Sequence, residues 1–88
     1  MEFTADTDSP IVAYFSKSPD FQCDKQDENV IGIYPFSKDS NKSVLQLSGR
    51  DLSDLTSNAE GDYIYVRFQA TEATTITPEM WDIQDTVN

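Results

Sequence analysis

The sequence predicts a mainly β (or α+β) domain, a small antiparallel sheet or barrel of four to five short strands with one or two short helical turns, the last near the C-terminus. Three observations predict it: short runs of β-branched and aromatic residues recur, turn-forming residues separate them, and one run alternates apolar with polar residues. With 88 residues, the chain has room for a single domain with a limited core. We expect residues 1–9 and 86–88 to be mobile.

The clearest strand lies within Asp62–Thr71. One alternating set is apolar and comprises Ile64, Val66, Phe68 and Ala70. The other set comprises Tyr63, Tyr65, Arg67 and Gln69. Because successive side chains of a strand point to opposite faces, the first set should face the core and the second the solvent or a partner.

Three further runs predict strands: Ile11–Phe15, Val30–Tyr34 and Ser43–Leu47. The first two are rich in β-branched and aromatic residues, the third is a short, partly apolar run, and each is followed by a proline or glycine that favours a turn. The segment Thr74–Thr77 either extends the long strand or starts a fifth.

Two short helical segments are predicted. Ser48 or Gly49 opens the first, which holds Asp51–Leu55 and turns two leucines, three residues apart, towards the core. The second begins at Thr77-Pro78-Glu79, where a threonine cap, a proline at the first position and an acid in the first turn are typical of a helix start.

Acidic residues dominate the charge. Sixteen acids face six bases, which gives a formal net charge of -10. The acids form two blocks: residues 1–29 carry seven acids and two bases, residues 30–50 one acid and three bases, and residues 51–88 eight acids and one base. Direct nucleic-acid binding is not expected, because affinity for phosphates comes from lysine and arginine.

The residues needed for most catalytic and cofactor sites are missing. There is no histidine to serve as general base, and Cys23 beside Asp24 is expected to be an inert thiol. Zinc and copper sites need clustered cysteine and histidine, and the three glycines are too far apart to form a phosphate-binding loop. Asp20, Asp24, Asp27 and Glu28 are dense enough for calcium but lack the alternating order of a calcium loop. We therefore expect neither catalysis, nor a cofactor, nor a metal.

The sequence also indicates a compartment. One cysteine cannot form an internal disulfide, and the first residues are acidic and polar rather than a basic and apolar leader. No apolar stretch approaches the ~20 residues of a membrane span. We expect a cytoplasmic protein that does not enter the membrane; its oligomeric state is not indicated.

Regularly spaced acids and exposed tyrosines are the candidate partner-binding residues. Glu79, Asp82 and Asp85 recur every three residues and would form a winding stripe if the segment were helical. Such a row has a charge density comparable to that of one nucleic-acid strand. Tyrosine and arginine are enriched at interface hot spots, so the tyrosine face of the long strand is a second candidate. The full set is Asp51, Asp54, Tyr63, Tyr65, Glu79, Asp82 and Asp85.

Two functional hypotheses follow. The first is an inhibitor or decoy of the phage-encoded, nucleic-acid-mimic type, which blocks the basic nucleic-acid-binding surface of a partner protein. The alternative is an accessory or structural subunit, or an adaptor, that binds a larger assembly through a β-edge or the tyrosine face. Helix capping, turn formation, solubility and adaptation to salt also explain acidic residues without any partner.

Overall fold

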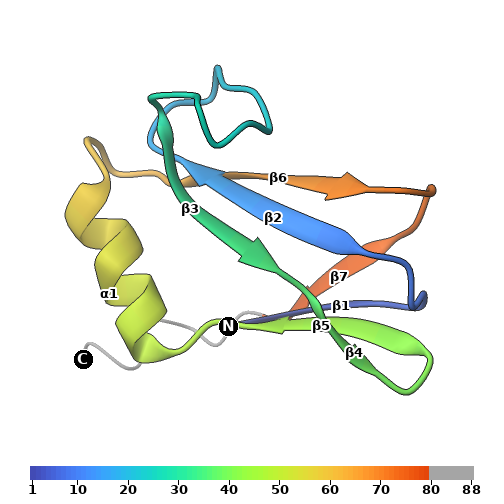
Figure 1. Ribbon diagram of the computed structural model, residues 1–88. Helices are drawn as coiled ribbons and strands as arrows, with labels where there is room; N and C mark the ends of the chain where they lie inside the picture. Colours follow the sequence, from blue (N-terminus) through green and yellow to red (C-terminus); the bar gives the residue numbers. More distant parts are fainter. Residues whose placement is uncertain (80–88) are drawn as a thin grey trace.

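The computed structural model describes residues 1–79, which form seven strands and one helix (Figure 1). In chain order they are β1 (Glu2–Ala5), β2 (Ile11–Ser16), β3 (Val30–Pro35), β4 (Ser37–Asp39), β5 (Lys42–Gln46), α1 (Gly49–Asn58), β6 (Tyr65–Ala70) and β7 (Ile76–Glu79). The predicted mainly β, antiparallel fold is confirmed. The described strands are more numerous than expected and make two sheets rather than a closed barrel.

The chain passes repeatedly from one sheet to the other. One sheet has the order β4-β5-β1-β7 and the other β3-β2-β6, and every described pair is antiparallel. The chain changes sheet between β1 and β2, between β3 and β4, between β5 and β6 through α1, and between β6 and β7. In Figure 1 the sheets come together where β1 leads into β2, and α1 lies at the opposite end.

Hydrogen bonds fix the end where the sheets meet. The buried Ser43 hydroxyl on β5 lies 2.8 Å from the carbonyl oxygen of Thr7 and 3.2 Å from that of Ser9. The Phe36 amide, between β3 and β4, donates to the Ile11 carbonyl at 2.8 Å. These hydrogen bonds satisfy polar groups that would otherwise be buried without a partner where the two sheets meet.

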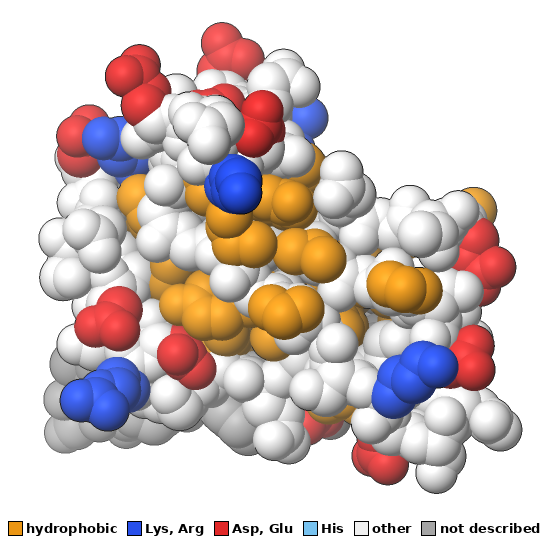
Figure 2. Space-filling view, viewed as in Figure 1, with side chains coloured by type: hydrophobic (Ala, Val, Ile, Leu, Met, Phe, Trp, Pro, Cys, Tyr) orange, Lys and Arg blue, Asp and Glu red, His pale blue; other side chains and the backbone are white. Residues whose placement is uncertain are grey.

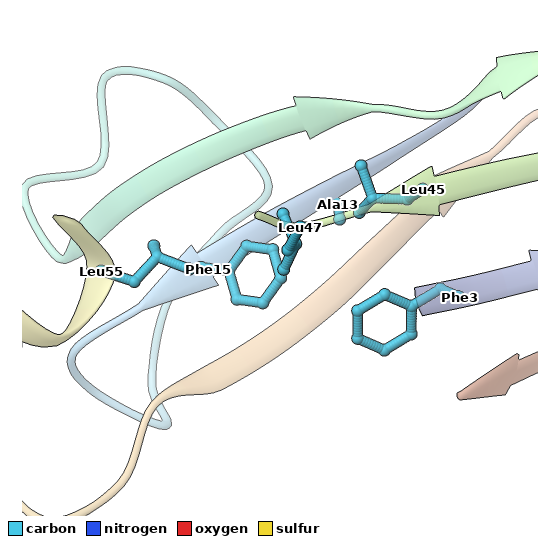
Figure 3. Packing of buried hydrophobic residues seen from close by; sticks show 6 residues of the cluster. All are labelled: Phe3, Ala13, Phe15, Leu45, Leu47 and Leu55. Carbon is cyan, nitrogen blue, oxygen red and sulfur yellow. The ribbon is translucent and has the colours of Figure 1, made fainter. Parts of the chain in front are cut away.

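The core lies between the two sheets and is closed by α1. Its buried cluster takes residues from β1, β2, β5, the short connection after β5 and the helix, namely Phe3, Ala13, Phe15, Leu45, Leu47 and Leu55 (Figure 3). The Phe3 ring is 5.3 Å from that of Phe68, edge to face, and 6.5 Å from that of Phe15. Aromatic contacts between strands of different sheets therefore hold the sheets together.

The N-terminal residues, which were expected to be mobile, include an interior strand of the four-stranded sheet. β1 lies inside its sheet, hydrogen-bonded to β5 on one side and to β7 on the other, and Phe3 is 6% exposed. The Leu47 amide also donates to the Met1 carbonyl at 2.9 Å. Four residues are too few to show a clear alternation of apolar and polar residues. The strand therefore forms through pairing with strands that are distant in the sequence. Residues 86–88 lie outside the described part of the chain.

The predicted C-terminal helix start was wrong. Thr77-Pro78-Glu79 belongs to β7, in which Thr77 faces Thr4 and Pro78 faces Phe3. Pairing with β1 outweighs the local capping pattern, since strand preferences depend strongly on tertiary context. Proline is compatible with this position because β7 is an edge strand of the described sheet, and prolines within sheets are largely confined to edge strands.

The first predicted helix is confirmed and is longer than expected. Ser48 caps α1, and its hydroxyl accepts from the Asp51 amide at 3.2 Å. Leu55 is 2% exposed, and Leu52 packs against the buried cluster. The two leucines thus attach one face of α1 to the core, as their spacing predicted.

Candidate binding site

A groove with a volume of about 850 Å³ runs between α1, β6 and the strands β1 and β7. Its lining is mostly apolar and includes Phe3, Leu52, Leu55, Val66, Phe68 and Pro78. Of the fifteen lining residues within the described part of the chain, one is acidic, Asp62, and none is basic. Ligand-binding sites are typically concave and apolar with few polar groups, so this groove is the candidate site.

The position of β6 explains why the groove exists. Val66 faces Phe15 and Phe68 faces Ala13 across the β2–β6 pair, so these two lie on the predicted core side of the strand, but Ala70, expected on the same side, is exposed. However, Val66 remains 36% exposed, because β6 is an edge strand of the described sheet. The alternation showed which face is apolar but not that part of this face is uncovered.

Several groove residues were not candidates from the sequence. Phe3 and Met1 come from a segment expected to be mobile, and Pro78 from a segment expected to be helical. Leu52 and Val66 were expected to be core residues. The sequence feature that could have indicated the groove is the apolar face of residues 64–70, which is longer than a small core could cover.

The two candidate tyrosines lie on different surfaces. Tyr63 precedes β6, is 71% exposed and lines the groove. Tyr65 begins β6, is half-buried and faces Ser16 across the pair, on the strand face opposite Val66. The Arg67 guanidinium lies 5.1 Å from the centre of the Phe21 ring, a cation–π contact within the domain. These side chains do not form the single patch that the alternation suggested.

The candidate acids of α1 have different surroundings. The Asp51 carboxylate accepts from the Ser48 amide at 2.9 Å and lies 3.0 Å from its hydroxyl, which completes a capping box. Asp54 is exposed. Burial raises the pKa of Tyr34, and the charges of Asp51 and Asp54 raise it further. Asp51 therefore has a structural role, and Asp54 is the freer of the two.

The remaining acidic candidates belong to the C-terminal part of the chain. Glu79 is the last residue of β7, so it is not the first member of a helical stripe. Asp82 and Asp85 lie outside the described residues.

Acids of the β2–β3 loop cap turns rather than converge on an ion. Asp27 accepts from the Gln22 amide at 2.7 Å and the Asn29 amide at 2.9 Å, and these bonds lower its pKa. Asp24 accepts from the Gln26 amide at 2.9 Å. Within residues 1–79, no three cysteine or acidic side chains come together as a metal site requires.

Acidic side chains are spread over the surface of the domain. No acidic residue among positions 1–78 is buried. Two ion pairs occur in this range, Lys17–Glu60 at 2.9 Å and Lys42–Asp6 at 4.0 Å. Figure 2 shows one face on which apolar side chains gather in the middle, with acidic side chains around them and over the loop from β2 to β3.

Comparisons with known proteins do not add an identification. The chain matches no protein-family model, no curated protein and no solved structure. In the described part of the chain, no helix has the length and apolar character to cross a membrane.

Proposed function

We propose that this domain is a non-catalytic acidic protein that binds a basic protein and inhibits it by occupying its nucleic-acid-binding surface. The observation that supports this function is the large excess of surface acids over bases, with two ion pairs in residues 1–78. Unpaired surface carboxylates remain available to lysine and arginine on a partner.

The charge explains both attraction and selectivity. A net charge of -10 on 88 residues steers a basic surface towards the domain and repels nucleic acid. A protein that binds the phosphate backbone presents such a basic surface. The proposal depends on the surface charge as a whole, because Glu79 ends a strand and Asp51 caps a helix.

Capture from a lysate of the source cells tests the proposal. The immobilised full-length chain should retain basic proteins at about 50 mM salt. The amount retained should be at least tenfold lower at about 200 mM salt. The captured protein should lose its nucleic-acid binding when the domain is added. Asp54→Lys and the pair Asp82→Lys and Asp85→Lys should each weaken capture, with circular dichroism as the control for folding. Capture that is indifferent to salt and to these reversals would contradict the proposal.

A second function is favoured by one observation. β6 is an edge strand of the described sheet, and an exposed edge can pair with a strand of another protein. An accessory subunit or adaptor that uses this edge would bind in a salt-tolerant way. Its binding would be lost in Tyr65→Ala or Tyr63→Ala and unaffected by the charge reversals.

A further inference from the structure

The groove beside α1 is a large apolar surface for such a small domain. Leu55 and Phe3 form part of its buried lining, and Val66, which also lines it, is 36% exposed. Soluble proteins rarely keep extensive contiguous apolar surface without a use, and such patches commonly mark interaction sites.

Charge selects among the occupants that an apolar groove could take. Asp62 is the charged residue among the lining residues in the range 1–79, and the chain as a whole carries -10. A second copy would bring the same charge and be repelled. Residues 80–88 of the chain contain two acids and no base, so they too would bring negative charge towards Asp62. A segment with lysine or arginine beside its apolar residues would instead be attracted.

We propose that this groove binds an amphipathic segment of a basic partner protein, with bulky apolar side chains inserted between α1 and β6 and flanking lysines or arginines near Asp62. This inference rests on the proposed function and adds an apolar anchor to the electrostatic attraction. Buried apolar contacts dominate affinity at most interfaces, whereas charges at the rim mainly raise the association rate. The anchor would therefore slow dissociation.

Tyr63 is placed to contribute at the mouth of the groove. It lines the groove, yet 71% of its surface is exposed when the domain is alone. Tyrosine offers a large amphipathic surface at low entropic cost and is enriched at hot spots. Tyr63 would thus be covered by the bound segment, with its hydroxyl left near solvent.

A pair of synthetic peptides tests the groove with the full-length chain. Both carry the same helical row of leucine and phenylalanine, flanked at each end by lysines in one peptide and by glutamates in the other. Fluorescence anisotropy of the labelled peptides should show binding of the lysine peptide, and binding of the glutamate peptide at least tenfold weaker. Equal affinities, or no binding of either, would overturn the proposal.

Two matched variants locate the binding. Thr56 and Ser57 are neighbouring exposed residues of α1, and of the two only Thr56 lines the groove. Thr56→Trp should fill the groove and weaken binding of the lysine peptide at least tenfold, whereas Ser57→Trp should leave the affinity for this peptide unchanged. Equal effects of the two variants would show that the peptide binds elsewhere.

Other occupants give distinct results. If Trp81→Ala is required before the lysine peptide binds, the groove belongs to the C-terminal residues of the chain. If sedimentation shows a dimer that Thr56→Trp dissociates, it belongs to a second copy. Either result would overturn the proposed occupant. Salt-sensitive capture of a basic protein that persists in Thr56→Trp would reject the groove and leave the proposed inhibitor function intact.

Discussion

The Leu55 side chain of α1 occupies the space beside Gly32 of β3: a Cβ atom at position 32 would lie 2.7 Å from Leu55 Cδ2 and 2.9 Å from Tyr34 Cε2. The helix therefore packs against the sheet at Gly32, a position that leaves no room for a larger side chain. Gly32→Ala should lower the free energy of unfolding by ~1–3 kcal/mol, the usual cost of overpacking. Urea denaturation measures this. Gly61→Ala is the control, because nothing lies within 4 Å of a Cβ atom there, and it should have a much smaller effect.

Phe3 should be among the most sensitive core positions. It is buried, lies on β1 between β5 and β7 in the sheet, and packs its ring against those of Phe15 and Phe68. Phe3→Ala should cost ~3–5 kcal/mol, a large share of the ~5–15 kcal/mol that stabilises a typical domain. Asp6→Ala, at an exposed position shortly after β1, should change unfolding little. If both variants unfold at the same denaturant concentration, β1 does not contribute to the core in solution.

The capping box of α1 should be measurable as stability. Ser48→Ala removes the acceptor for the Asp51 amide and should cost ~0.5–2 kcal/mol. Ser53→Ala, at an exposed helical position, should be neutral or slightly stabilising. Thermal unfolding followed by circular dichroism distinguishes the two. A Ser48→Ala variant as stable as the parent would remove the structural role assigned to the cap.

Two hydrogen-bonded carboxylates should link stability to acid pH. Hydrogen bonds from the Gln22 and Asn29 amides lower the pKa of Asp27, and one from the Thr7 hydroxyl, at 2.6 Å, lowers that of Glu72. A lowered folded-state pKa means that the stabilisation is present above the unfolded value and is lost as pH falls through the folded value. Urea midpoints should therefore fall on acidification below about pH 4. In Asp27→Ala this fall should be smaller, and an unchanged pH profile would contradict the assignment.

Tyr34 should report the charge on α1. Its pKa is raised by burial and then by the charges of Asp51 and Asp54. Asp54→Asn should shift the ultraviolet titration of this phenol towards lower pH, because one of the two charges that disfavour the phenolate is removed. Subtracting the titration of Tyr34→Phe assigns the signal. No shift in Asp54→Asn would mean that Asp54 does not face Tyr34.

The sequence by itself determined the β class, the face of β6 that is apolar, the first helix with its leucines, and the acidic surface. Each depends on local alternation, spacing or composition, which neighbouring residues carry. Tertiary structure alone decided that Glu2–Ala5 is an interior strand and that Thr77-Pro78-Glu79 is a strand rather than a helix start, since those residues pair with partners more than thirty positions away. It also decided that Val66 borders an open groove, because burial depends on which elements cover a face. Local pattern fixes which surfaces are apolar or charged, whereas long-range pairing decides which of them stay accessible to a partner.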